Sequence, residues 1–132
     1  MKLVHGIDLV EIASTERLLN EPKDHHLKRC FTPAEQLSAG TGFERAAKLS
    51  GRFAAKEAVM KALGTGFGNG IGFLDIEVTT LQSGQPQITL FREAEKLANS
   101  YGISSWIVST SHEAGFAVAS VIGLGHDHRD DV

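Results

Sequence analysis

Cysteine is nearly absent from this chain of 132 residues, since Cys30 is the only one. A single thiol cannot form an internal disulfide or a zinc site of several cysteines, which favours a reducing compartment. Long apolar runs are also missing, because the longest, residues 115–125, is too short and too rich in glycine to span a bilayer. No signal peptide is visible, because Asp8 and Glu11 interrupt the apolar start. We therefore expect a cytoplasmic protein with no membrane association.

Proline is scarce as well, with three residues, and we see no linker, internal repeat or low-complexity segment. A hydrophobic content of 42% and a charged content of 22% are ordinary for a globular protein. The length suits one domain with a modest core. We expect a single domain over residues 1–124 and a polar, frayed tail over residues 125–132.

The net charge of −3 hides a basic region. Between residues 17 and 61 there are nine Lys or Arg residues and five acidic ones. A local basic region on an acidic chain favours a polyanionic ligand or an acidic protein partner over nonspecific nucleic-acid binding. The alternative is a solvated basic face, and charge alone does not decide between the two.

Hydrophobic periodicity and turn residues predict an α+β fold. The expected strands cover residues 2–10, 73–81, 87–91, 106–112 and 116–122, and the expected helices cover residues 11–20, 25–31, 43–63 and 92–101. Thr32, Pro33 and Glu35 form a capping-box pattern at the start of one further short helix.

Two acidic residues lie in apolar surroundings. Asp8 falls inside the first strand, two residues after Gly6, which allows another group to approach closely. Helical spacing predicts one apolar arc on the long helix, formed by Ala46, Leu49, Phe53 and Met60. Glu57 lies at the edge of this arc, with Lys61 one turn beyond it. Taken alone, Asp8 is also explained as a cap of the following helix, and Glu57 and Lys61 as a surface pair. The sharper interpretation is a metal ligand with a phosphate-binding lysine beside it.

Five glycines occur in residues 64–72, directly after the long helix. Gly64 is expected to form a left-handed helix cap. The loop can present backbone N–H groups to phosphate, but it lacks the Gly-Lys-Ser/Thr ending of a P-loop and follows a helix rather than a strand.

Three motifs together are more specific than any of them alone. Gly6-Ile7-Asp8 lies near the start, Gly51-Arg52-Phe53-Ala54-Ala55-Lys56-Glu57-Ala58-x-x-Lys61-Ala62 in the middle, and Ser109-x-Ser111-His112 near the end. In this order and spacing they resemble the holo-acyl-carrier-protein synthase family of phosphopantetheinyl transferases. The likeness extends to about residue 123 and implies that family's fold, a small antiparallel sheet packed around one long central helix.

The resemblance implies transfer of the 4′-phosphopantetheine arm of coenzyme A to a serine of apo-acyl carrier protein, with release of adenosine 3′,5′-bisphosphate. It implies that Asp8 and Glu57 hold Mg²⁺, that Lys61 lies near the pyrophosphate, and that Glu57 helps to remove the serine proton. Arg52 and His112 match positions that contact nucleotide phosphates in the family, although a histidine buried in the core is the alternative for His112. The backbone of Gly64, Thr65 and Gly66 is expected to assist.

The resemblance further implies a homotrimer with active sites at subunit interfaces, because one small domain offers little surface for coenzyme A. Arg17, Lys23, Lys28 and Arg29 are the candidates for docking the acidic carrier. The segment Ala13-Ser14-Thr15-Glu16 is less basic than is common in the family, and Glu113 stands where many relatives carry Thr. Two alternatives remain: a metal-dependent nucleotide pyrophosphate hydrolase, and a non-catalytic subunit that binds coenzyme A or a nucleotide.

Overall fold

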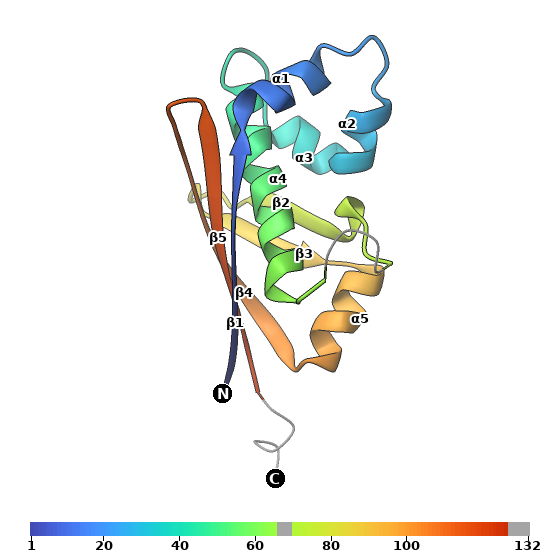
Figure 1. Ribbon diagram of the computed structural model, residues 1–132, viewed down its shortest axis with the longest axis vertical. Helices are drawn as coiled ribbons and strands as arrows, with labels where there is room; N and C mark the ends of the chain where they lie inside the picture. Colours follow the sequence, from blue (N-terminus) through green and yellow to red (C-terminus); the bar gives the residue numbers. More distant parts are fainter. Residues whose placement is uncertain (66–69, 127–132) are drawn as a thin grey trace.

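The computed structural model describes residues 1–65 and 70–126. Its elements, in chain order, are β1 (Lys2–Glu11), α1 (Ile12–Leu19), α2 (His25–Cys30), α3 (Pro33–Ser38), α4 (Arg45–Ala62), a 3₁₀ turn η1 (Phe73–Asp75), β2 (Ile76–Thr80), β3 (Pro86–Leu90), α5 (Arg92–Ser100), β4 (Ile103–Glu113) and β5 (Phe116–Gly125). The predicted α+β class is therefore confirmed, and the fold is organised around α4 (Figure 1).

The strands form two antiparallel sheets. The larger has the order β1-β5-β4, and the smaller pairs β2 with β3. In the larger sheet, Asp8 is opposite Ala119 of β5, and Ala119 is opposite Thr110 of β4. This register places Asp8 on an edge strand, with its neighbours held by the long β4–β5 hairpin.

The helix α4 is buried on most sides, and not along one arc as the spacing of Ala46, Leu49 and Met60 predicts. Ala54, Ala55, Ala58 and Val59 are also fully buried. The reason is that β1, β5 and β4 pack on one side of α4 while α1, α3 and β2 pack on others. Small side chains let these elements approach the helix closely, which fixes the rotation of α4 about its axis.

Gly6 is the point of closest approach between β1 and α4. A Cβ atom at this position would overlap the carbonyl oxygen of Ala58. A glycine is therefore required here, as the sequence predicts. The contact brings Asp8, two residues along β1, next to the last two turns of α4.

The observed element bounds differ from the predicted ones in detail. Residues 73–75 form a 3₁₀ turn rather than the start of a strand, and β4 and β5 are longer than predicted. Gly125, predicted to begin the polar tail, ends β5 and pairs with Lys2. The rest of that tail, beyond residue 126, lies outside the described residues. No helix in the described ranges is both long and apolar enough to cross a membrane.

Candidate functional site

Asp8 and Lys61 form an ion pair between β1 and α4. The Lys61 ammonium donates to Asp8 Oδ1 at 2.7 Å and to the carbonyl oxygen of Ile7 at 3.0 Å. The N-cap position of α1 is Glu11 and no side chain caps the helix. The interpretation of Asp8 as a helix cap is therefore wrong, and so is the pairing of Lys61 with Glu57.

Glu57 lies beside this ion pair, half-buried on α4. Burial raises the pKa of its carboxyl above the ordinary value, the charge of Asp8 raises it further, and the charge of Lys61 lowers it in part. The charge of Asp8 acts on the Glu57 carboxyl, so the two carboxylates share one small region. This is the juxtaposition that the sequence predicts for Asp8 and Glu57.

The donor set of this region fits Mg²⁺. The two carboxylates supply hard oxygen ligands from two rigid elements, and Mg²⁺ typically takes one or two protein carboxylates together with waters and substrate phosphates. Within residues 1–65 and 70–126, no group of three or more His, Cys, Asp or Glu side chains forms a metal site. The residues therefore suit a cation shared with a phosphate ligand, and do not suit a closed protein cage.

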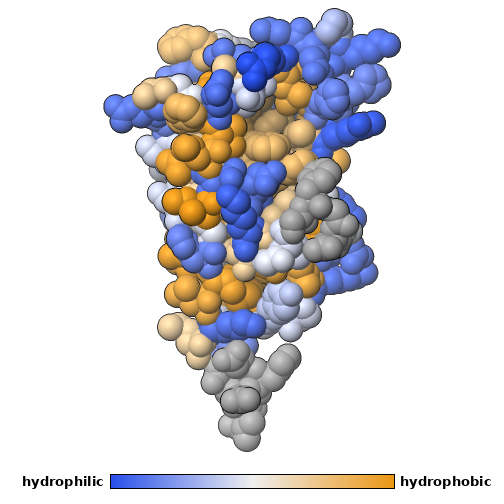
Figure 2. Space-filling model, viewed as in Figure 1, coloured by the Kyte–Doolittle hydropathy of each residue, from blue (hydrophilic) through white to orange (hydrophobic). Residues whose placement is uncertain are grey.

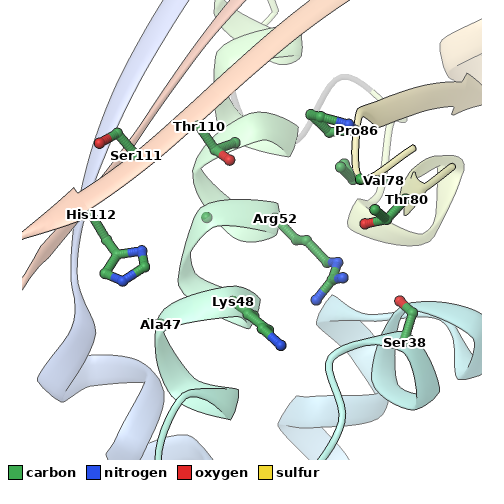
Figure 3. Close-up of a pocket in the computed structure, with 12 residues that line it drawn as sticks. Ser38, Ala47, Lys48, Arg52, Val78, Thr80, Pro86, Thr110, Ser111 and His112 are labelled. Atoms are coloured by element: carbon green, nitrogen blue, oxygen red, sulfur yellow. The ribbon is translucent and has the colours of Figure 1, made fainter. Parts of the chain in front are cut away.

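Arg52 lies in a separate pocket of about 430 Å³ between α4, β4 and the β2–β3 hairpin (Figure 3). Arg52 is 8% exposed, and its Nη1 atom has no hydrogen-bond partner within the described part of the chain. Burial lowers the pKa of its guanidinium, although an arginine still carries its charge. An unpaired buried donor is costly, so this pocket is suited to an anion.

His112 and Lys48 line the same pocket. Figure 3 shows the side chains of Lys48 and Arg52 reaching from α4 to the same side, with His112 on β4 across from them. His112 is exposed, so its interpretation as a buried core histidine is wrong. The sequence did not single out Lys48, because an exposed lysine on a helix carries no signal of its own.

The other predicted site residues are dispersed. Gly64 has φ of +72° and caps α4, as predicted. Thr65 is buried, with its backbone N–H donating to the carbonyl oxygen of Met60 at 2.9 Å. Gly66 lies outside the described residues. Among the docking candidates, Arg17 donates to Ser14 Oγ at 3.0 Å, and Lys23, Lys28 and Arg29 are exposed on and before α2.

A buried ion pair that the sequence did not reveal lies next to Glu57. The Lys56 ammonium donates to Glu35 Oε1 at 2.6 Å, to the carbonyl oxygen of Cys30 at 2.7 Å and to that of Phe73 at 3.0 Å. Glu35 Oε2 accepts from the backbone N–H of Val78 at 2.9 Å. The pair ties α2, α3, η1 and β2 to α4. Its only sequence signal was the capping box of Glu35, which points to a local role.

The pocket of Arg52 and the carboxylates of Asp8 and Glu57 face different parts of the molecule. Neither carboxylate lines the pocket, and Glu57 lies five positions after Arg52 on α4, which turns their side chains well apart. A ligand held by Arg52 of this chain therefore lies away from the two carboxylates of the same chain.

Comparison with known proteins gives a consistent result. A family model described as the 4'-phosphopantetheinyl transferase superfamily matches residues 5–119. The chain is 43% identical to the holo-[acyl-carrier-protein] synthase of Geobacter sp. (strain M21) over 117 residues, which cover 89% of this chain and 94% of that one. It is 45% identical to the holo-[acyl-carrier-protein] synthase of Gloeobacter violaceus over 121 residues, 91% of each chain.

Solved structures agree. The Helicobacter pylori holo-[acyl-carrier-protein] synthase in complex with coenzyme A is similar with a TM-score of 0.79 at 37% identity, over 91% of this chain and 99% of that one. The Chronobacterium ammoniagenes complex of the same kind of synthase with coenzyme A gives a TM-score of 0.81 at 30% identity, over 96% of this chain and 100% of that one.

Proposed function

The chain belongs to the holo-[acyl-carrier-protein] synthase family of 4'-phosphopantetheinyl transferases, and on this premise we propose how its residues divide the reaction. The enzyme transfers the 4'-phosphopantetheine moiety of coenzyme A to a serine of apo-acyl carrier protein. The observation that supports the assignment of the catalytic residues is the juxtaposition of Asp8, Glu57 and Lys61 at the contact between β1 and α4.

We propose that Asp8 and Glu57 hold Mg²⁺, which when bound supplies charge stabilisation to the pyrophosphate of coenzyme A. Lys61, already paired with Asp8 and 55% exposed, offsets further charge on the same phosphates. Glu57 is the candidate acceptor of the serine proton, because its raised pKa brings its basicity closer to neutral pH. The proton leaves the serine as its oxygen attacks phosphorus, and adenosine 3′,5′-bisphosphate is the leaving group.

We propose that Arg52, with Lys48 and His112 beside it, binds phosphate groups of the nucleotide part of coenzyme A. The buried and unpaired Nη1 of Arg52 supports this assignment. The backbone of Gly64, Thr65 and Gly66 remains a candidate for additional phosphate contacts.

We further propose that the active form is a homotrimer in which one subunit supplies Asp8, Glu57 and Lys61 and its neighbour supplies the Arg52 pocket. The separation of the two regions within one chain supports this arrangement. The outward face of β1 also carries Leu3, Ile7 and Leu9, each more than half exposed. Figure 2 shows apolar surface gathered along that edge, and burying such a face between copies is favourable.

The acidic carrier is proposed to dock on α1 and α2, through Arg17, Lys23, Lys28 and Arg29. These side chains are exposed on the part of the surface where hydrophilic residues predominate in Figure 2. Opposite charges speed the encounter and set its orientation. The location in the cytoplasm stays a prediction.

The test is a set of initial rates measured with the purified protein, coenzyme A, apo-acyl carrier protein and Mg²⁺, leaving out one component at a time. We expect adenosine 3′,5′-bisphosphate to appear only when all components are present, in step with modified carrier. Bisphosphate without the carrier would favour a pyrophosphate hydrolase. Binding of coenzyme A without any product would favour a non-catalytic subunit.

A further inference from the structure

A shallow apolar groove lies between the end of α2, α3 and η1, next to the basic side chains of α1 and α2 that are proposed to dock the carrier. Its volume is about 770 Å³, and its apolar walls are Phe31, Pro33, Leu37 and Leu74. Phe31 is buried and forms the floor, whereas Leu37 is 83% exposed and Leu74 is 37% exposed. The side chain of Leu37 is largely exposed on the short helix α3 and buries little apolar area within the fold. Its apolar surface is therefore available to a partner.

The two charged side chains that line the groove are both cations. Lys28 of α2 and Arg92 at the start of α5 line it, and no Asp or Glu is among the described residues that do so. Arg92 is fixed in place, because its guanidinium donates to Asp75 Oδ1 at 2.7 Å and to the carbonyl oxygen of Leu74 at 2.8 Å. Arg29 adds a further exposed cation on α2. An apolar strip between cations complements an amphipathic helix with an acidic polar face.

The floor of the groove packs against α4, the helix that carries Glu57. Lys56, the residue before Glu57, lies with its ammonium 5.3 Å from the centre of the Phe31 ring, and Phe53 of α4 packs on Phe31 with ring centroids 6.4 Å apart. Burial raises the pKa of Cys30, which ends α2, and the nearby charge of Glu57 raises it further. The groove and the Glu57 carboxylate therefore flank the same end of α2.

We propose that this groove is a docking surface for the acyl carrier protein, which places an apolar side chain of an acidic helix against Leu37 and Leu74 between Lys28 and Arg92. The inference rests on the proposed function and extends the carrier surface from α2 over α3 to η1. Lys28, predicted from the sequence as a docking residue, is where the two surfaces meet. The carrier is held by apolar burial here, in addition to the attraction of opposite charges.

The experiment measures transfer kinetics with apo-acyl carrier protein and coenzyme A varied separately, for Leu37→Ala and Leu37→Asp. Leu37 is exposed, so neither substitution disturbs the core. Leu81→Ala and Leu81→Asp are the matched controls, because Leu81 is 47% exposed and lies outside the groove. We expect KM for the carrier to rise severalfold in Leu37→Ala and about tenfold or more in Leu37→Asp, with kcat and KM for coenzyme A unchanged. The controls should leave KM for the carrier within about twofold of wild type.

An unchanged KM for the carrier in Leu37→Asp would overturn the inference while leaving the proposed function intact. A rise in KM for coenzyme A instead would assign the groove to the co-substrate and would equally overturn it. Failure of the proposed function is a different result, since the wild-type protein would then modify no carrier at all.

Discussion

The proposed chemistry depends most on Glu57, because this residue is both a proposed Mg²⁺ ligand and the candidate acceptor of the serine proton. Its carboxylate lies near the charges of Asp8 and Lys61. Glu57→Gln keeps the shape and removes the charge, so we expect transfer to fall by at least about a hundredfold. Asp8→Asn should have an effect of similar size. Both should be measured as kcat at saturating coenzyme A, with circular dichroism to verify folding. Retention of more than a tenth of the wild-type rate in either variant would refute the proposed ligand roles.

The pH dependence of Glu57 provides a second residue-scale prediction. Its pKa is raised in the folded state, so in the absence of Mg²⁺ the folded protein favours the protonated carboxyl. That contribution to stability is present below the ordinary pKa of a glutamate and is lost as the pH rises through the raised value. Glu57→Gln should therefore be more stable than wild type at neutral pH, with the difference shrinking on acidification. Urea unfolding of both proteins at several pH values, with Mg²⁺ removed, measures this difference and its pH dependence.

Mg²⁺ should reverse the order of stability of wild type and Glu57→Gln, because it binds the deprotonated carboxylate of Glu57. Added Mg²⁺ should raise the melting temperature of the wild-type protein at neutral pH and have little effect on Glu57→Gln. The wild-type response should disappear on acidification at a pH above the ordinary pKa of glutamate. An equal response in both proteins would mean that the cation binds elsewhere.

Motif resemblance in the sequence singled out Asp8, Glu57 and Lys61 as candidate catalytic residues, but it did not give their pairing. Helical spacing joins Lys61 to Glu57, whereas the structure joins Lys61 to Asp8. The difference arises because β1 approaches α4 closely at Gly6, which is a tertiary contact that no local pattern describes. Lys56 was missed for the same kind of reason, since its partner Glu35 lies on another helix and has a sufficient local role as a cap.

At the scale of elements, the contact between β1 and α4 determines whether the site forms. Gly6→Ala places a methyl group against the carbonyl oxygen of Ala58, where neither backbone can yield cheaply. We expect a loss of stability of about 3 kcal/mol and a fall in kcat, because the shift separates Asp8 from α4. Gly72→Ala is the control, since a Cβ there meets open space. Denaturant unfolding measures the first effect, and an unchanged Gly6→Ala protein would refute the account of the contact.

The second prediction at this scale concerns the buried ion pair of Lys56 and Glu35. Lys56→Met leaves the Glu35 carboxylate buried without its cation, which should cost about 3–5 kcal/mol of unfolding free energy. Adding Glu35→Gln should recover part of that loss, because the uncompensated charge is then gone. Lys96→Met, at an exposed lysine, should change stability by less than about 0.5 kcal/mol. A greater loss in the double variant than in Lys56→Met would contradict this explanation.

Elements with strong local signals were predicted well. The capping box of Thr32 and Glu35 starts α3 as expected, and Gly64 caps α4 in the left-handed region. The 3₁₀ turn at residues 73–75 was not predicted, because apolar residues at that point suit a strand equally well. The nearly complete burial of α4 was also missed, since it depends on how many elements surround the helix.

At the scale of the whole molecule, the proposed trimer makes a prediction that a single-chain site does not. Subunits carrying Glu57→Gln and subunits carrying Arg52→Met are each expected to be inactive alone. When the two are refolded together, the intact Glu57 of one meets the intact Arg52 of the other, and part of the activity should return. No recovery in mixed assemblies of verified composition would show that each site is built within one chain.

The central claim is that this protein attaches phosphopantetheine to a carrier serine, and the intact mass of the carrier tests it most directly. Apo-acyl carrier protein incubated with the enzyme, coenzyme A and Mg²⁺ should gain the mass of one phosphopantetheine group. A carrier in which the acceptor serine is replaced by alanine should gain nothing. A wild-type carrier whose mass stays unchanged, while the folded enzyme binds coenzyme A, would contradict the account.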